Sequence, residues 1–311
     1  MLGAQVYSCS HDLQVNMAHV PVLLNQVLEI LEPKPGKIFA DGTVGSGGHA
    51  IPIIERLAPD GIFLGIDWDE EAIRKLEVRS RKYASRLKKL ILKVGNYANL
   101  PEILKSEKLE KVDGVLLDLG FSSEQLESGK GFTFTKDEPL IMTYSKGRLP
   151  AHRALMQLTK TELAEILRTY GEERFSGRIA TAIWERERGQ PIKTSGELQE
   201  VIRRAVPKGY ERGRINPATR TFMALRIYLN DELGNLEKFL RAVPEVTAKG
   251  GRIAVISFHS LEDRLVKNYF RDFAKGGKAR LITKKPIIAS DNEIRSNPRS
   301  RSAKLRAIEL I

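Results

Sequence analysis

The stretch Asp41-Gly-Thr-Val-Gly-Ser-Gly-Gly-His49 decides the fold of this chain, together with Asp67 at the end of the next apolar run. The apolar run at 37–40 predicts a strand, the glycines predict a tight loop, and a helical pattern begins at Gly48. This order of strand, glycine loop, helix, strand and acid is typical of a nucleotide-cofactor site. The glycines let the backbone approach a ligand closely, and Asp67 is placed to accept hydrogen bonds from two ribose hydroxyls. An ordinary tight turn of an α/β sheet is the alternative interpretation.

The loop fits a dinucleotide poorly. The dinucleotide fingerprint G-x-G-x-x-G sets a pyrophosphate on a helix N-terminus, whereas here the third glycine, Gly48, is out of place. The carboxylate of Asp41, at the strand end, would repel a pyrophosphate and attract an ammonium. S-adenosylmethionine has a ribose, an adenine, a cationic amino-acid end and no phosphate, so it fits better. An NAD-dependent dehydrogenase is therefore disfavoured.

The composition is that of a soluble globular protein with one large domain or two. Of 311 residues, 41% are hydrophobic and 29% are charged. No apolar run approaches the roughly 20 residues that a membrane helix needs, and no signal-peptide pattern is present. The single cysteine, Cys9, excludes a disulfide framework, a cysteine-based zinc site and a zinc base deaminase. These features predict a cytoplasmic protein with no membrane partner.

The net charge of +12 indicates a polyanionic partner, and its distribution favours nucleic acid. Residues 275–306 hold ten Lys and Arg against two acids, and residues 203–226 hold seven against one. A third basic run, 79–93, is interpreted as a solvated face. Within the first two runs, four arginines are interpreted as phosphate contacts, with solvated surface as the alternative. They are Arg220, Arg226, Arg299 and Arg301.

Strands and helices alternate along the first third of the chain, which predicts a doubly wound, mostly parallel α/β sheet. Strands are expected at 37–41, 61–66, 89–94 and 112–117, and helices at 20–31, 48–57, 69–83 and 97–106. Asp41, Asp67 and Asp118 then fall at strand ends, where ligands bind in open α/β sheets. Cofactor contacts are expected from these residues.

The alternation stops after residue 130, and only helical patterns follow from Ala151 to Val206. Capping boxes are expected at Thr159 and Thr194, and one long helix from Asn216-Pro217 to Val243. Strands at 250–257, 279–284 and 304–310 and a helix at 261–274 complete the expected elements. The predicted organisation is a disordered extension (1–16), a cofactor domain in two parts (17–135 and 214–311) and an inserted helical domain (136–213).

Several motifs together resemble one family, the bacterial MraW-type (RsmH-type) methyltransferases. They occur in the family's order and cover residues 19–311. The stretches are His19-Val-Pro-Val-Leu-Leu, Asp41-Gly-Thr-Val-Gly-Ser-Gly-Gly-His, Asp118-Leu-Gly-Phe-Ser-Ser-Glu-Gln-Leu, Arg168-Thr-Tyr-Gly-Glu-Glu-Arg-Phe, Asn216-Pro-Ala-Thr-Arg-Thr-Phe, Ile256-Ser-Phe-His-Ser-Leu-Glu-Asp-Arg and Asn297-Pro-Arg-Ser-Arg-Ser.

The resemblance implies a Rossmann-like class I methyltransferase with a helical domain inserted after its fourth strand. It implies S-adenosylmethionine-dependent methylation of the N4 amine of a cytidine in small-subunit (16S) ribosomal RNA, as naked RNA or in the assembled subunit. The implied cofactor contacts fall on Gly47, Gly48, His49, Asp67, Tyr97, Asp118 and Gln125. One stretch departs, because the family usually reads Pro-Leu-Asp-Met-Arg-Met-Asp where this chain has Pro139-Leu-Ile-Met-Thr-Tyr-Ser145.

Candidate catalytic residues are Asp118, Phe121 and His259. Asp118-Leu-Gly-Phe121 corresponds in the fold to the Asp-Pro-Pro-Tyr of amine-directed methyltransferases, so its oxygens can accept from the amine. Phe121, where the family usually has an aliphatic residue, either stacks on an extruded base or packs in the core. His259 acts as a base, bonds the RNA, or is structural beside a capping box at Ser260 and Asp263. The alternative function is a catalytically inactive RNA-binding protein, which the altered 139–145 stretch permits.

Overall fold

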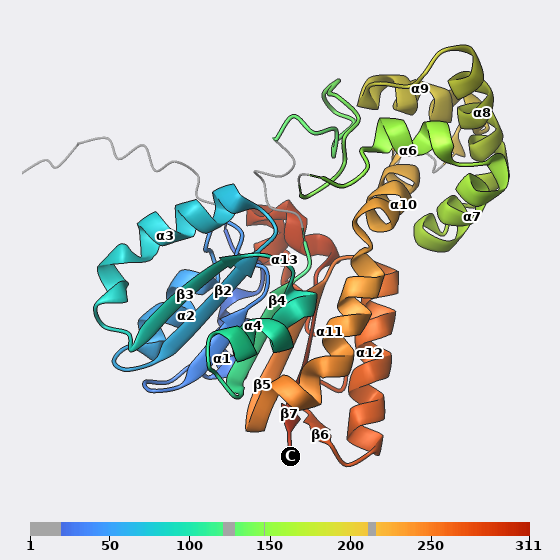
Figure 1. Ribbon diagram of the computed structural model, residues 1–311. Helices are drawn as coiled ribbons and strands as arrows, with labels where there is room; N and C mark the ends of the chain where they lie inside the picture. Colours follow the sequence, from blue (N-terminus) through green and yellow to red (C-terminus); the bar gives the residue numbers. More distant parts are fainter. Residues whose placement is uncertain (1–19, 121–127, 146, 211–215) are drawn as a thin grey trace, which may run out of the picture.

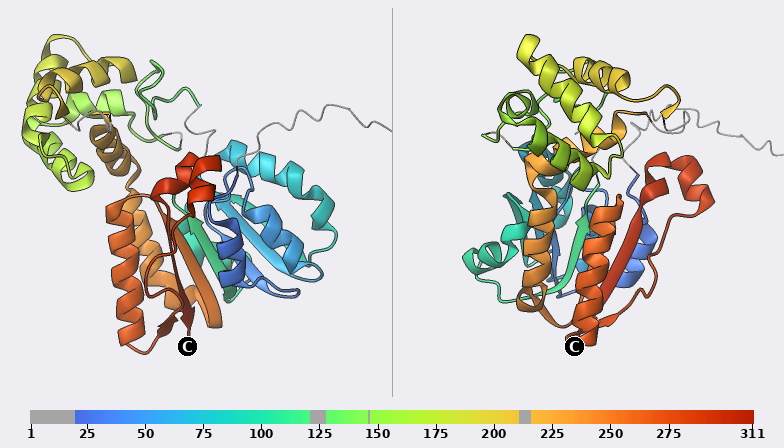
Figure 2. Two further views of the ribbon diagram at one scale, coloured as in Figure 1. Left: turned by 180° about the vertical axis from the view of Figure 1, so that it is seen from behind. Right: turned by 90° about the vertical axis from the view of Figure 1, so that its right-hand side faces the viewer.

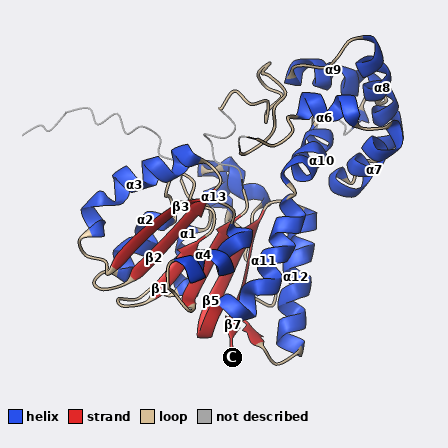
Figure 3. Ribbon diagram, in the orientation of Figure 1, coloured by secondary structure: helices blue, strands red, loops and turns tan. Residues whose placement is uncertain are grey.

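A computed structural model of the protein describes residues 20–120, 128–145, 147–210 and 216–311. In these ranges one seven-stranded sheet has the order β3-β2-β1-β4-β5-β7-β6 (Figures 1 and 3). Strands β1 to β5 are parallel, and β7 runs antiparallel to both β5 and β6. The strands are β1 (Ile38–Asp41), β2 (Ile62–Asp67), β3 (Lys89–Val94), β4 (Val112–Asp118), β5 (Thr247–Ser257), β6 (Ala279–Leu281) and β7 (Lys304–Leu310). The predicted mostly parallel, doubly wound sheet is confirmed.

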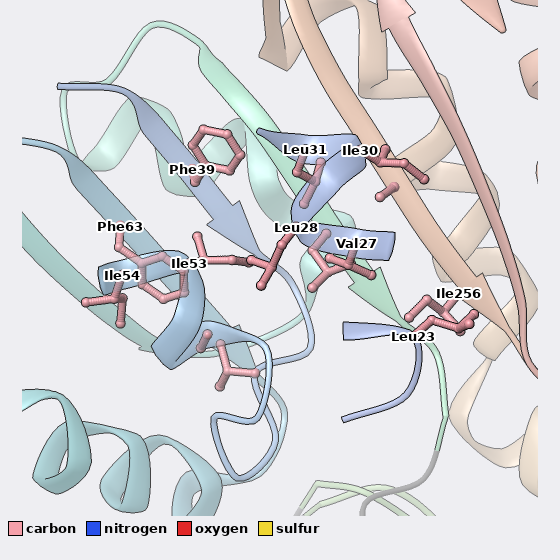
Figure 4. Close-up of a cluster of buried hydrophobic side chains, with 14 of the residues drawn as sticks. Leu23, Val27, Leu28, Ile30, Leu31, Phe39, Ile53, Ile54, Phe63 and Ile256 are labelled. Atoms are coloured by element: carbon pink, nitrogen blue, oxygen red, sulfur yellow. The ribbon is translucent and has the colours of Figure 1, made fainter. Parts of the chain in front are cut away.

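Helices cover both faces of the sheet, because each presents an apolar stripe to it (Figure 2). One face carries α1 (Leu24–Leu31), α2 (Ala50–Leu57) and α3 (Glu70–Ala84), and the other carries the 3₁₀ turn η1 (Tyr97–Asn99), α4 (Leu100–Ser106), α11 (Glu232–Val246) and α12 (Ser260–Lys275). Figure 4 shows the first core, where Val27 and Leu31 of α1 and Ile53 of α2 meet Phe39 and Phe63 of the strands. The second core includes Leu236 and Phe239 of α11.

A second body of helices stands beyond the sheet, in the upper right of Figure 1. Its own apolar cluster joins the side chains of its helices and of the segment around Leu140 and Met142. The helices are α6 (Ala151–Gln157), α7 (Lys160–Gly171), α8 (Ser176–Gly189), α9 (Ser195–Ala205) and α10 (Thr219–Asn230). Both predicted capping boxes are present, at the N-termini of α7 and α9. The expected helical insertion is therefore a separately packed unit.

The prediction of one long helix ending at Val243 is wrong. Helix α10 ends at Asn230, Asp231 takes a left-handed conformation with φ 50°, and α11 begins at Glu232. Apolar side chains of α10 lie in the helical cluster, whereas those of α11 lie in the core of the sheet. The chain therefore passes from one body to the other at Asp231, although the predicted boundary between residues 213 and 214 remains a prediction.

Two predicted helix N-caps, at Asn216 and Ser260, are also displaced. The side chain of Asn216 accepts from Ala218 N, and α10 begins later, at Thr219. The capping box of α12 uses His259 and Glu262 instead of the expected Ser260 and Asp263. Within the described ranges, no helix is both long and apolar enough to cross a bilayer.

Candidate functional site

A cavity of about 940 Å³, including its open mouth, lies at the carboxyl edge of the sheet. Asp41, Asp67 and Asp118 are the last residues of β1, β2 and β4, as the sequence predicts. The described residues that line the cavity are Pro21, Thr43, Val44, Gly45, Ser46, Gly48, His49, Asp67, Trp68, Tyr97, Asp118, Leu119, Gly120, Tyr144, Glu232, Leu236 and Glu262.

Asp67 lines the cavity and is fixed from behind by the backbone. Its Oδ2 accepts from Gly45 N at 2.8 Å, and its Oδ1 accepts from Asp69 N at 2.9 Å. Each carboxylate oxygen can accept a further hydrogen bond, so two acceptor positions remain for a ligand. Burial raises the pKa of Asp67 to about 6 against the lowering effect of these donors. The carboxylate is thus held ready for a pair of hydroxyl donors.

The glycines shape the loop in different ways. Gly47 has φ +85°, and a Cβ there would lie 2.9 Å from Cδ1 of Leu76 on α3. Gly47 is not among the cavity-lining residues, whereas Gly45 and Gly48 are. Gly47 therefore serves the turn and the packing of the loop on α3, while its neighbours form the wall.

Asp41 lies beneath the cavity wall rather than on it. Its Oδ1 accepts from Thr43 N at 3.0 Å, and Oγ1 of Thr43 accepts from Asp118 N at 2.7 Å. Burial, with the nearby charges of Asp118 and Asp67, raises the pKa of Asp41 to about 7. In this structure Asp41 orients Thr43, which links the ends of β1 and β4.

His49 connects the loop to the end of β4. Its Nε2 lies 2.9 Å from the carbonyl oxygen of Val22, which can only accept, so Nε2 carries a proton. Its Nδ1 then faces Oδ2 of Asp118 at 3.5 Å. The ring is buried, and the Val22 contact fixes its orientation. His49 is thereby placed beside Asp118, and both residues line the cavity.

Another part of the cavity wall comes from residues that the sequence did not single out as site residues. Oε1 of Glu232 accepts from the hydroxyl of Tyr144 at 2.8 Å, and Oε2 accepts from Nη2 of Arg226 at 2.9 Å. Burial, followed by the nearby charge of Glu232, raises the pKa of Tyr144 well above its usual value. Ring centroids of Tyr144 and Trp68 are 6.1 Å apart.

Glu262 completes this wall from the N-terminus of α12. Its Oε2 accepts from Phe258 N at 2.9 Å, and its Oε1 lies 3.0 Å from Nε2 of His259. Nδ1 of His259 accepts from Glu262 N at 3.4 Å, in the capping box. His259 itself is not among the cavity-lining residues. The structure therefore places it behind Glu262.

The polar lining of the cavity is acidic. Four carboxylates line it (Asp67, Asp118, Glu232 and Glu262), and none of its described lining residues is Lys or Arg. Such a set would repel a pyrophosphate and suits a cationic ligand with hydroxyl groups. S-adenosylmethionine fits these carboxylates, because its sulfonium and ammonium are cationic and its ribose hydroxyls can donate hydrogen bonds.

Comparison with known proteins identifies a methyltransferase family, which agrees with a cavity suited to S-adenosylmethionine. The model of the MraW methylase family matches residues 16–311. The chain belongs to this family. It is 45% identical to "Ribosomal RNA small subunit methyltransferase H" of Heliobacterium modesticaldum, over 94% of this chain and 98% of the relative. The protein of the same name from Syntrophotalea carbinolica is 46% identical, over 93% and 97%.

The fold of this methylase is that of the class I methyltransferases, and its cofactor is S-adenosylmethionine. Among solved structures it is similar to a putative rRNA methylase from Clostridium thermocellum, with a TM-score of 0.42 and 14% identity. That likeness covers 94% of this chain and all of the other.

The predicted RNA contacts of the methylase fall in three different settings. Arg226 is buried beside Glu232, with Nε 2.8 Å from Oε1, so this placement does not support a phosphate contact. Nη1 of Arg220 donates to the carbonyl of Glu172 at 3.1 Å. Arg299 and Arg301 lie exposed on the 3₁₀ turn η3 (Pro298–Ser302). The periodicity of α10 gave no sign that Arg226 turns inward.

The remaining predicted residues divide between the cavity and the undescribed segments. Tyr97 lines the cavity, and burial raises its pKa well above the usual value. Phe121 and Gln125 lie outside the described residues, as does the predicted extension 1–16.

Sequence reasoning missed Tyr144, Glu232 and Glu262 as lining residues. Signals existed for two of them. Tyr144 is in the stretch that departs from the family pattern, and Glu262 is in the family motif around His259.

Proposed function

We propose that this methylase transfers a methyl group from S-adenosylmethionine to the N4 amine of a cytidine in small-subunit ribosomal RNA, in the cytoplasm. The substrate is the RNA itself or the assembled small subunit. The name of the relatives supports the ribosomal substrate. The observation that carries the proposal is the acidic cavity at the strand ends, in a chain that matches the family over residues 16–311.

The cavity suits chemistry in which positioning is the main task. The lone pair of the cytosine amine is delocalised into the ring, so the amine is a poor nucleophile and must be aligned and polarised. S-adenosylmethionine supplies an electrophilic methyl group when it is bound. Asp67 provides acceptors for the ribose, and Asp118 provides an oxygen near the site of transfer. Thr43 holds the end of β4 that carries Asp118.

The inactive RNA-binding alternative predicts an absence of methyl transfer. Asp67, Asp118 and the glycine loop are all present at the cavity, which favours the enzyme. The altered stretch also contributes Tyr144 to the wall, so its divergence leaves the cavity complete on that side.

Mass spectrometry of small-subunit RNA from cells with and without the protein tests the proposal. We expect one N4-methylcytidine that disappears with the gene and returns with the parent protein. An Asp118→Ala variant should fail to restore it. A methyl mark that persists without the gene, or a product methylated elsewhere than at N4 of cytidine, would contradict the proposal.

A further inference from the structure

We propose that Glu232 and Glu262 together form the acceptor pair that binds the exocyclic amine of the target base. This assignment rests on the proposed function and names the residues that receive its substrate. Both carboxylates line the same cavity as Asp67 and Asp118. Carboxylate oxygens of Glu232 and Glu262 and a ring nitrogen of His259 all lie within 4.8 Å of one another.

Glu232 is fixed by donors on the helical side of the cavity. Arg226 contacts both of its oxygens, and the hydroxyl of Tyr144 donates to Oε1. Arg226 is on α10 and Tyr144 is on the segment that leads into α6, so both come from the helical body. Because Arg226 and Tyr144 hold it, the carboxylate is kept in one orientation, and the remaining lone pairs of its oxygens can accept from a ligand in the cavity.

Glu262 is fixed by the start of α12. The backbone N–H groups of Phe258 and His259 both donate to its Oε2, which leaves Oε1 directed at the cluster. The side chain of His259 is only 9% exposed, and its buried Nε2 makes no hydrogen bond within the described part of the chain, although Oε1 of Glu262 is 3.0 Å away. His259 is therefore a positioning residue behind Glu262, and the cluster has room for another partner.

The strand order separates Glu262 from the ribose acceptor along the edge of the sheet. Asp67 ends β2, while Glu262 follows β5, three strands away in the order β2-β1-β4-β5. At about 4.8 Å per strand, the strands β2 and β5 themselves are roughly 14 Å apart. A cofactor whose ribose lies on Asp67 leaves this wall for the second reactant. Two fixed acceptors suit an amine with two N–H groups, because they hold its plane and raise its electron density.

A divalent cation is the rival occupant of Glu232, His259 and Glu262. The guanidinium of Arg226, which is already at both oxygens of Glu232, would repel a metal ion, so the geometry favours a neutral donor. A second rival is the ammonium of the cofactor itself. Both rivals give measurable results that differ from those of the amine pair.

The test uses Glu262→Gln and Glu232→Gln in the full-length protein. Matched controls are Asp272→Asn on α12 and Glu245→Gln on α11, which are exposed carboxylates on the same helices. We expect kcat on small-subunit RNA to fall about 100-fold in each cavity variant, as when one preorganised group is lost from a transition-state site. The Kd for S-adenosylmethionine, measured by calorimetry, should stay within about twofold of the parent, which also shows that the cavity is folded. The controls should match the parent.

Three results would overturn the assignment. Unchanged turnover in both variants would remove the pair from the substrate site. A loss of cofactor affinity equal to the loss of turnover would assign the pair to the cofactor's ammonium. Parent activity that is abolished by a chelator and restored by Mg²⁺ would assign the cluster to a metal. If the parent protein itself methylates no cytidine, the proposed function fails first, and that outcome is distinct because it appears before any substitution.

Discussion

Nε of Arg226 lies 2.8 Å from Oε1 of Glu232, across the turn at Asp231 that joins α10 to α11. The pair is largely buried, with side-chain exposures of 11% and 13%. It therefore ties the helical body to the cavity wall, and the guanidinium of Arg226 is directed at Glu232. This difference between Arg226 and the exposed arginines of η3 can be measured.

Substitutions of these arginines should differ in how they change the salt dependence of RNA binding. Replacing both Arg299 and Arg301 by Ala should flatten the slope of log K against log salt by about two units, if each meets one phosphate. Arg226→Ala should leave the slope unchanged but lower stability by about 3–5 kcal/mol, because it leaves Glu232 buried without this cation. Filter binding across a salt series and thermal melting provide the two readouts. An unchanged slope in the double variant would exclude η3 from the interface.

Asp67→Ala should weaken S-adenosylmethionine binding by roughly 2–4 kcal/mol, because a buried carboxylate loses a pair of hydrogen bonds to the ribose. The same substitution releases Gly45 N, so the loop should also become less ordered. Calorimetry measures the affinity, with Glu71→Gln, an exposed acid of α3, as the control. Parent-like affinity in Asp67→Ala would rule out the ribose assignment.

Cofactor binding should release protons near neutral pH. The pKa values of Asp67 and Asp41 are raised to about 6 and about 7, and a cationic ligand favours their ionised forms. Affinity should therefore rise by up to about a hundredfold per pH unit below pH 6, by up to about tenfold between pH 6 and 7, and level off above about pH 7. Titration in two buffers of different ionisation enthalpy would count the protons. Affinity that is flat from pH 5 to 8 would contradict this linkage.

In the protein without cofactor, the raised pKa of Asp41 should make the free energy of unfolding fall as pH rises, whereas cofactor affinity should increase with pH. The folded pKa of Asp41, about 7, exceeds the ordinary value of 3.8, so between these pH values the folded state binds a proton that the unfolded state lacks. The free energy of unfolding should thus fall as pH rises from about 4 to 7, by at most on the order of 4 kcal/mol. Asp41→Asn keeps an acceptor for Thr43 and should remove this fall. A pH-independent difference between variant and parent in chemical denaturation would disprove it.

The first four strands were predictable from the sequence because they are short apolar runs, and three of them, β1, β2 and β4, end in an aspartate. The limits of β3 match the expected 89–94, and those of β1, β2 and β4 differ by one residue at one end or both. The turn at Asp231 was not, because neither glycine nor proline marks it and both flanking segments have helical patterns. The helix breaks at Asp231 because α10 packs in the helical cluster whereas α11 packs in the core of the sheet.

The cavity could be predicted only in part. Asp67 and Asp118 follow strands, so their edge of the sheet is determined by the parallel order. Glu232 and Tyr144 are 88 residues apart in the chain, and their contact depends on how the helical body docks. A single sequence has no local pattern for such a contact. His259 shows the same limit, since its family motif did not reveal that it stands behind Glu262.

Strand β7 is the last element of the chain but lies inside the sheet, between β5 and β6, which has a consequence for folding during translation. Strands β2 to β5 each pair with a strand made earlier, whereas β6 pairs only with β7, which is made after it. A nascent chain therefore exposes the open edge of β5 until Lys304–Leu310 has left the ribosome, and open edges invite pairing with other chains. Completion of the sheet is thus a late event of translation, and changes in β7 act first on the yield of folded protein.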